Sequence, residues 1–421
     1  MNTDHVEALT QRASILIDQN RHEDAATMLA EALSNNPEDT SALYLLALCQ
    51  MNIPSKISEA IETINRAISI DSWNSSFFAL RSLVYNKLDK HKQALEDADR
   101  AICTDPENVF AHIAHGSALL GMEKWRDAEM AFRAALAIDP DNTDAGNLLT
   151  MSLRHQNQMS KTTGQVEHLL AKNPNDSFSH ANAGWVALER HDLKKAKFHF
   201  LESLRLDPDS EYARNGILET FKAKSPFYRL YLDYCLKMAK LPTQTRFVII
   251  IGLYFAIKLM RAIFTGNLMV IGSIAVLLYM LFAMWTWVAR GVGNLFLLLN
   301  RFARNALKTG EKIEAVLVGG NVLTGIIITI LAFGAGITSL IFLGPSLIGS
   351  ALPFSLVFQN NHRIGKHFYA VVGGLVLFGG ALSFLLYIVP IENLYPVTPG
   401  GFAIIIAVIV SWLGTFGFLR K

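Results

Sequence analysis

The stretch ALEDADRAICTDPEN at 94–108 is followed 34 residues later by AEMAFRAALAIDPDN at 128–142. In both copies a run of small and apolar residues ends at an Asp-Pro pair. Prolines occupy the same place in further copies, which gives the series Pro37, Pro106, Pro140, Pro174 and Pro208. Proline lacks a backbone N–H and clashes with the preceding helical turn, so each copy ends a helix at a fixed point. A period of 34 residues with a terminal proline is typical of an array of helix–turn–helix units.

Small residues keep the same period as the prolines. Alanines recur in pairs seven residues apart, which is two helical turns, so both members of a pair lie on one helix face. A partner helix can approach closely only where that face is small. The pairs are Ala25 and Ala32, Ala60 and Ala67, Ala94 and Ala101, and Ala128 and Ala135, and the small residues of the preceding helices are Ala13, Ala47, Ser82, Gly116 and Gly184.

This combination of residues resembles the tetratricopeptide repeat (TPR) family. The resemblance implies six units, at 6–39, 40–74, 75–108, 109–142, 143–176 and 177–210. In the second unit there is one extra residue, and Ser72 stands in the proline place. The fifth unit departs most, because Thr150, Thr162 and Leu169 replace small residues. We expect an all-α solenoid over 1–224 that includes a capping helix near 211–222.

The resemblance also implies a site, because TPR arrays bind protein partners on a concave wall built mainly from the first helices. The predicted wall residues are Tyr44, Leu48, Leu83, Asn86, Phe110, Ile113, Met151, Phe178 and Trp185. The alternative is that several of these apolar side chains pack between repeats. Thr10 and Ser14 stand where some members of the family carry a lysine and asparagine clamp for acidic tails. We therefore expect a partner segment with apolar anchors and basic flanks.

The charge of the chain is divided between its two halves. Residues 1–233 hold 24 Lys/Arg and 33 Asp/Glu, a net charge of −9, whereas residues 234–421 hold 14 and 3, a net of +11. Acidic residues become rare where long apolar runs begin. This composition predicts a water-soluble domain joined to a membrane domain.

The C-terminal half contains runs of about 20 apolar residues, the length that crosses a bilayer. We expect a juxtamembrane connector at 225–246 and a multi-span bundle at 247–421. Its six predicted spans are 247–264, 268–289, 315–333, 337–358, 368–389 and 402–419.

Basic residues lie in alternate connections, which by the positive-inside bias places both termini and the repeats in the cytoplasm. The first span is exceptional, because it contains Lys258 and Arg261. Intramembrane charge is a functional hypothesis, and the alternative is that both side chains reach the headgroups. If this span does not cross, the two termini lie on opposite sides.

A basic amphipathic helix is predicted at 291–309, with Gly310 as its C-terminal cap. Its residues Arg301, Arg304 and Lys308 would contact anionic lipid at the inner leaflet. The alternative is an ordinary helix packed under the membrane domain.

Motifs for chemistry are almost absent from the sequence. There is no HExxH, no phosphate-binding loop and no dinucleotide glycine fingerprint. Ser346 loosely resembles the serine of rhomboid-type proteases, but no histidine lies on a later predicted span. His112 and His115 are three apart without a third ligand at recognisable spacing, and the three cysteines are scattered. We predict a protein that is not an enzyme and that has no metal, no cofactor and no nucleic-acid partner.

Together these features predict a scaffold or chaperone that recruits a protein partner to the cytoplasmic face of a plasma membrane, namely a bacterial inner membrane. Residues 1–20 show no basic region followed by an apolar core, so we expect no signal peptide. The alternative is a component of a transporter or channel regulated through its cytoplasmic repeats.

Overall fold

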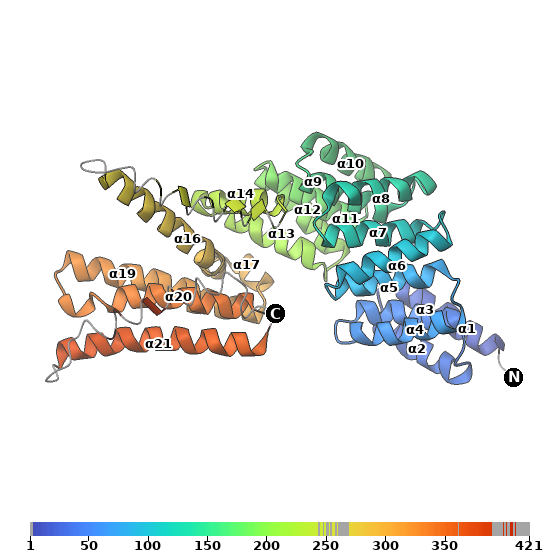
Figure 1. Cartoon of the computed structure of the whole chain (residues 1–421), viewed down its shortest axis with the longest axis horizontal. Coiled ribbons are helices and arrows are strands. Elements are labelled where there is room, and N and C mark those ends of the chain that lie inside the picture. Colours follow the sequence, from blue (N-terminus) through green and yellow to red (C-terminus); the bar gives the residue numbers. More distant parts are fainter. Residues whose placement is uncertain are drawn as a thin grey trace. The chain divides into compact units, whose positions relative to one another are not determined.

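The computed structural model describes residues 3–242, 269–360 and 362–389, with scattered residues of 245–259 and 399–409 (Figure 1). Every regular element in these described residues is helical, which confirms the predicted all-α solenoid. The chain divides into two compact units. The first comprises Met1–Arg190, Glu202–Asp209 and Ala239–Thr245, and the second comprises His191–Leu201, Ser210–Met238 and Arg246–Lys421.

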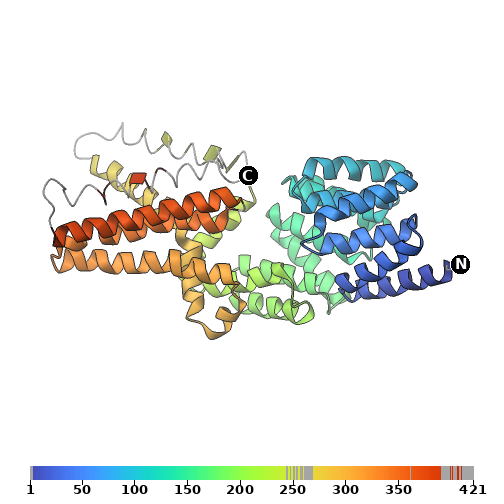
Figure 2. The same cartoon turned by 90° about the horizontal axis from the view of Figure 1, so that it is seen from below.

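Helices of the repeats come in pairs, one pair in each predicted unit, and those of the first compact unit stack in chain order (Figures 1 and 2). The helices are α1 (Thr3–Asp18), α2 (His22–Asn35), α3 (Thr40–Asn52), α4 (Ile57–Ile70), α5 (Ser75–Lys87), α6 (His91–Thr104), α7 (Val109–Gly121), α8 (Trp125–Ile138), α9 (Thr143–His155), α10 (Met159–Lys172), α11 (Ser177–Glu189) and α12 (Leu193–Leu206).

An N-cap side chain, two residues after the proline position, fixes where the next helix begins. The carboxylate, amide or hydroxyl oxygen of that residue accepts hydrogen bonds from backbone N–H groups of the next helix, which have no partner within it. These caps are Asp39, Asn74, Asn108, Asn142, Asp176 and Ser210. The proline therefore ends one helix and the capping residue begins the next.

The turn inside each pair also has a fixed geometry. In five of the pairs the middle residue of the three-residue turn has a positive φ between 57° and 62°, at Asn20, Asp89, Glu123, Asn157 and His191. The second unit has no such residue, because its extra residue lengthens the turn between α3 and α4. The irregularity at Ser72 and this longer turn belong to the same unit.

Small residues allow the paired helices to touch. All eight alanines of the predicted pairs are fully buried. A Cβ at Gly116 would lie 2.5 Å from the Phe132 ring, so only glycine fits at that contact. In the fifth unit the large Leu169 stands where other units have an alanine, and Gly146 on the paired helix makes room for it. A Cβ at 146 would lie 2.7 Å from the leucine Cδ2. The irregular unit therefore keeps the same close packing.

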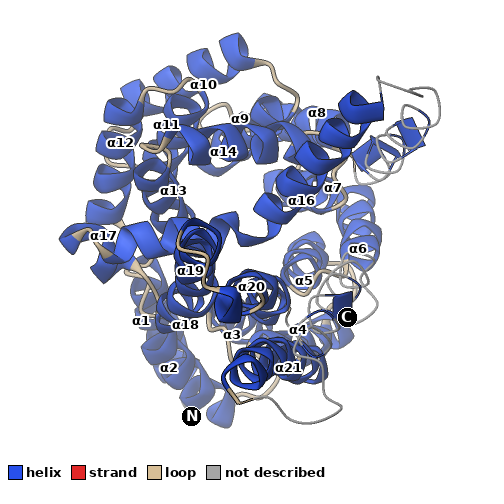
Figure 3. Cartoon of the chain, turned by 90° about the vertical axis from the view of Figure 1, so that its left-hand side faces the viewer, coloured by secondary structure: helices blue, strands red, loops and turns tan. Residues whose placement is uncertain are grey.

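The second compact unit contains α13 (Glu211–Lys222), most of α14 (Pro226–Ala239) and a set of longer apolar helices. Figure 3 looks along α19, α20 and α21, which lie side by side. The remaining elements are α16 (Met269–Leu298), α17 (Arg301–Ala306), α18 (Thr309–Glu314), the π-helix η2 (Ala315–Gly320), α19 (Asn321–Gly334), the 3₁₀ turn η3 (Thr338–Leu340), α20 (Leu343–Gln359) and α21 (Arg363–Ile388).

Within the described residues, two helices are long and apolar enough to cross a membrane, Thr309–Gly334 and Arg363–Ile388. They contain the predicted spans 315–333 and most of 368–389. Helix α20 is shorter, with 17 residues, and begins at Leu343 rather than at 337. The predicted spans 247–264 and 402–419 lie outside the continuously described residues.

The predicted single helix at 291–309 is wrong. Residues up to Leu298 continue α16, and the chain then breaks at Asn300, whose side chain caps α17. Gly310 lies in the first turn of α18 and is not a C-terminal cap. The apolar periodicity arises because Leu297, Ala303 and Leu307 form one buried cluster across the break.

Helix α13 does not present a solvated outer face in the way a terminal cap would. Leu218 is buried together with Leu297, Ala303 and Leu307, so α13 packs on α16 and α17. Its residues therefore belong to the second compact unit, and the predicted boundary at 224 does not coincide with a boundary between compact units.

Candidate functional site

The predicted concave wall is partly buried. Ile113 is buried, and the other eight wall residues are half-buried. Tyr44, Leu48, Leu83 and Phe110 pack against the buried core of the first repeats. For these four side chains the structure favours packing between repeats, the alternative that the sequence left open.

Asn86 is also held in place by its neighbours. Its amide nitrogen donates to the Ser117 carbonyl at 3.1 Å, and its oxygen lies 2.7 Å from Nδ1 of His91. Met151, Phe178 and Trp185 keep part of their surface exposed. These three form the part of the predicted wall with accessible apolar surface away from the first repeats.

A polar cluster lies beside Trp185. The Arg154 guanidinium is 5.3 Å from the centre of the Trp185 ring and 3.6 Å from the Glu189 carboxylate. Lys240 donates to Glu189 at 2.8 Å and to Asn157 at 3.1 Å. A residue from beyond the repeats thus completes this end of the wall. The sequence pattern did not indicate this, because Lys240 lies outside the 34-residue period.

Trp73 was also missed. Its side chain is 82% exposed in the turn between α4 and α5. Tryptophan is the residue type most enriched at binding hot spots. The signal was available, since Trp73 directly follows the serine that replaces the repeat proline.

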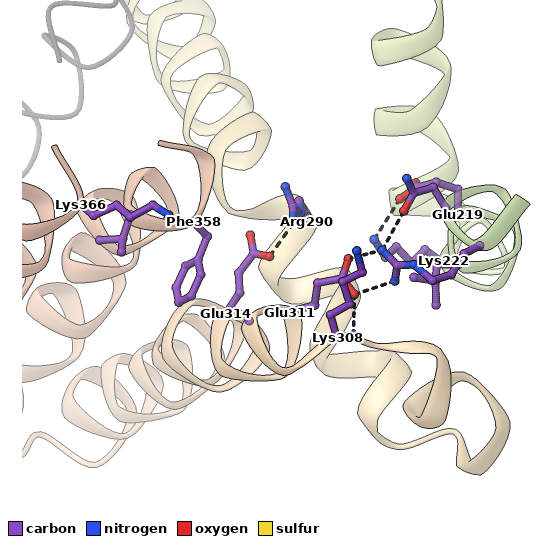
Figure 4. A pocket seen from close by; sticks show the side chains of 13 residues that line it. Glu219, Lys222, Arg290, Lys308, Glu311, Glu314, Phe358 and Lys366 are labelled. Atoms are coloured by element: carbon purple, nitrogen blue, oxygen red, sulfur yellow. Dashed lines mark hydrogen bonds and ion pairs between the residues drawn. The ribbon is translucent and has the colours of Figure 1, made fainter. Parts of the chain in front are cut away.

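A second candidate site is a cavity of about 780 Å³ in the second compact unit. It is lined by residues of α13, α16, α18, α20 and α21 and of the turn before α18 (Figure 4). The lining residues are Arg214, Asn215, Leu218, Glu219, Lys222, Arg290, Lys308, Gly310, Glu311, Glu314, Val357, Phe358 and Lys366.

Ion pairs organise the wall of the cavity nearest α13. Arg214 contacts Glu311 at 2.9 Å and Glu211 at 3.1 Å. Lys308 contacts Glu211 at 2.8 Å. Lys222 contacts Glu219 at 2.9 Å. Although burial opposes it, hydrogen bonds from Lys308 and Arg214 lower the pKa of Glu211 below its usual value.

A buried acid lies deeper in the cavity wall. Glu314 is 1% exposed, and its Oε2 lies 3.2 Å from Nε of Arg290 and 3.1 Å from the amide of Asn294. Its other oxygen, Oε1, is buried without a hydrogen-bond partner in the described part of the chain. The sequence missed this site because the predicted span began at Ala315 and Arg290 was assigned to a connection.

Comparison with known proteins agrees with the repeat geometry. Residues 10–76 match the tetratricopeptide repeat family. The N-terminal region is a TPR array. Its period and its buried alanines are those that the sequence predicted.

Curated relatives match over single stretches of the chain. The chain is 35% identical over 81 residues to "Tetratricopeptide repeat protein 28" of Homo sapiens, which covers 19% of this chain and 3% of that protein. It is 32% identical over 85 residues to "Protein STIP1 homolog" of Dictyostelium discoideum, which covers 20% and 15%. The chain therefore spans a small part of the length of these relatives.

A solved structure of a tetratricopeptide repeat protein from Parabacteroides merdae is also similar. It has a TM-score of 0.45 and 15% identity, and the match covers 52% of this chain and 85% of that one.

The remaining predicted site residues belong to the second half of the sequence. Arg301 and Arg304 are exposed on α17, whereas Lys308 is tied to Glu211 at the cavity. Lys258 and Arg261 lie outside the described residues. No group of three or more metal-ligating side chains occurs in the described part of the chain. His112 lies 2.9 Å from the Pro106 carbonyl, and His115 lies 3.2 Å from Asp99.

Proposed function

We propose that this protein is a membrane-held TPR scaffold. In this proposal the array binds a protein partner, and the C-terminal helices hold it at the cytoplasmic face of a bacterial inner membrane. One observation carries the proposal. The same chain contains a TPR array and long apolar helices. TPR arrays mediate protein–protein interaction, and the two helices are long enough to span a bilayer while most of their residues are not buried.

The exposed surface of these helices is apolar. In water, each Å² of exposed apolar area costs about 25 cal/mol relative to burial, and a lipid environment removes that cost. Large side chains point outward along both spanning candidates: Ile326, Ile330 and Phe333 on α19, and Val371, Leu375 and Phe378 on α21. This pattern favours insertion into a bilayer over a water-soluble helical bundle.

The short helix α17 suits contact with the membrane surface. Leu299 and Phe302 are exposed beside Arg301 and Arg304. Apolar side chains flanked by arginines favour an interface with anionic headgroups. We assign this contact to α17 and the turn before it, rather than to the longer helix that the sequence predicted.

The partner-binding face proposed for the array comprises Met151, Phe178 and Trp185, whose surfaces are partly exposed. Residues 1–233 carry a net charge of −9. A partner segment with apolar anchors and basic flanks matches both features, because anchors supply most of the binding energy and opposite charge directs the encounter. The same chemistry serves a stable scaffold and a chaperone.

Site-specific photocrosslinking of the full chain in its membranes tests this proposal. A photoreactive residue in place of Trp185 or Met151 is expected to give a discrete protein adduct. The matched control is Glu167, which is exposed on α10, the second helix of its pair. Adducts that form equally well from position 167 would contradict binding at the concave wall.

Phe110 is a poorer test of the wall than Trp185. It packs against the buried core of the first repeats, so its truncation also removes core contacts and destabilises the array. Loss of binding by Phe110→Ala would then report loss of folding.

A transporter or channel component is the second candidate function. The Arg290–Glu314 pair favours it, because Glu314 lies within the helix segment Thr309–Gly334 and is buried. Ionisable groups within membrane segments often line ion or substrate pathways. The test is a flux assay with the full chain in sealed vesicles: flux that Glu314→Gln abolishes would favour transport over scaffolding.

A further inference from the structure

The cavity in the second compact unit carries an excess of positive charge. Five basic and three acidic residues line it. Arg214, Lys222 and Lys308 are each held in ion pairs with carboxylates. Arg290 is paired with Glu314 through Nε alone, and Lys366 has no ion pair with a described residue, so these two cations keep the most capacity for a ligand.

These two cations have unused hydrogen-bonding capacity. Among the described residues Arg290 contacts Glu314 through Nε, which leaves the Nη groups of the guanidinium for another acceptor. Lys366 is exposed, and it forms no ion pair with any described residue. In the view of Figure 4, Lys366 and Phe358 lie on one side of the cavity and Glu219 and Lys222 on the other, with Arg290 between them.

A second observation points to a ligand rather than to a solvated charged surface. Oε1 of Glu314 is buried without a partner in the described part of the chain, although buried polar atoms are almost always hydrogen-bonded. This oxygen can accept a hydrogen bond from a hydroxyl or ammonium group. A ligand that carries such a donor next to an anionic group would satisfy both Glu314 and the two cations.

We propose that this cavity binds a phosphoester, with Arg290 and Lys366 as ligands of its phosphoryl group. A planar guanidinium and a flexible ammonium are the side chains that bind phosphate in proteins. The hydroxyl or ammonium group next to the phosphoryl group donates to Glu314. A volume of about 780 Å³ is that of a small-molecule site rather than of a single ion.

The position of the cavity suggests two sources for this chemistry. Lys308 and Glu311 lie at the start of the segment Thr309–Gly334, and Lys366 lies in the first turn of α21. If these segments cross the bilayer, the cavity lies in the headgroup layer, and the ligand is a phospholipid headgroup. That source rests on the proposed membrane location. The alternative source, a soluble phosphoester, does not.

Titration calorimetry on the full chain in detergent separates the outcomes. The probes are dihexanoyl phosphatidylglycerol, a short-chain phospholipid, and glycerol 3-phosphate. A charge-assisted hydrogen bond contributes about 1.5–3 kcal/mol, so Lys366→Gln and Arg290→Gln should each weaken binding about tenfold or more. Binding of the phospholipid alone assigns the site to lipid, and equal binding of both probes assigns it to soluble phosphoesters.

The matched control is Arg126→Gln, which removes the same charge from an exposed position on α8, outside the cavity lining. It should change affinity by less than about twofold, because an exposed charge is screened by salt. Lys366→Gln leaves the pair between Arg290 and the buried Glu314 intact, so it remains informative even if Arg290→Gln fails to fold. The proposal is overturned if neither probe binds, if folded Lys366→Gln binds like wild type, or if Arg126→Gln loses as much affinity.

Discussion

The two compact units obtain their order from interactions of different range. In the TPR array, polar contacts join residues about one repeat apart, as between Asn86 and Ser117 or Asn147 and Asp176. In the second unit, the Arg214–Glu311 pair joins residues 97 positions apart. Short, repeated contacts leave a periodic trace in the sequence, whereas a single long-range contact leaves none.

This difference also predicts how each unit responds to the loss of one interaction. In an array, each repeat contacts mainly its neighbours, so damage stays local. In the second unit the Arg214–Glu311 pair joins α13 to α18, and the Arg290–Glu314 pair joins α16 to α18. The three substitutions below test the comparison, in order of decreasing effect.

The largest effect is expected for Arg290→Gln. It leaves the Glu314 carboxylate, which is 1% exposed, with Asn294 as its remaining partner. An uncompensated buried charge costs about 3–5 kcal/mol. Hydrogen exchange of the amides of α16 and α18 should therefore accelerate by about a hundredfold or more.

The control for this ion pair is Arg81→Gln in the TPR array. Arg81 binds both oxygens of Asp97, at 2.7 and 2.6 Å, within one helix pair. We expect a smaller effect, confined to α5 and α6, because the Asp97 side chain keeps 10% of its surface exposed, against 1% for Glu314. Two results would contradict the comparison: faster hydrogen exchange throughout the array in Arg81→Gln, or no faster exchange in the second unit in Arg290→Gln.

An intermediate effect is expected for Gly116→Ala. The new methyl group would meet the Phe132 ring at 2.5 Å, and overpacking of this kind costs about 1–3 kcal/mol. The control is Gly164→Ala on the exposed face of α10, where no atom lies within 4 Å of the added Cβ. That change should stabilise its helix by about 0.5–1 kcal/mol. Hydrogen exchange of the amides of α8 and α10 measures the change in stability caused by each substitution. Equal changes would refute the close packing at Gly116.

The smallest effect is expected at the helix caps. The Asn142 side chain accepts a hydrogen bond from the backbone N–H of Ala145. Asn142→Ala removes this cap, which costs about 1 kcal/mol. Lys124 precedes α8 without a side-chain cap bond, so Lys124→Ala should have almost no effect. Hydrogen exchange of the first amides of α9 and of α8 measures the effects of the two substitutions. If both variants behave alike, the capping series does not set the repeat boundaries.

The TPR fold was predictable because its causes recur. Each proline stop, capping side chain and buried alanine appears several times in register, and these determine the helix pairs. The fifth unit shows the limit of the pattern, since Leu169 is accommodated by Gly146 rather than by a small residue at its own position.

The sites were less predictable because they depend on contacts that occur once and have no counterpart in other repeats. The apolar residues Tyr44 and Phe110 have the spacing of a binding wall, but spacing does not distinguish a groove from the packing between repeats. The pair of Arg290 with Glu314 required knowledge that α16 extends to Leu298. Hydropathy alone places both residues in connections.

The central claim is that the second half of the chain lies in a membrane and presents the TPR array to the cytoplasm. Protease digestion of the full chain in inside-out bacterial membrane vesicles tests it most directly. The account predicts that protease added outside removes the repeats, while the apolar segments of 269–389 remain protected until detergent opens the vesicles. Complete digestion without detergent, or protection of the repeats, would contradict it.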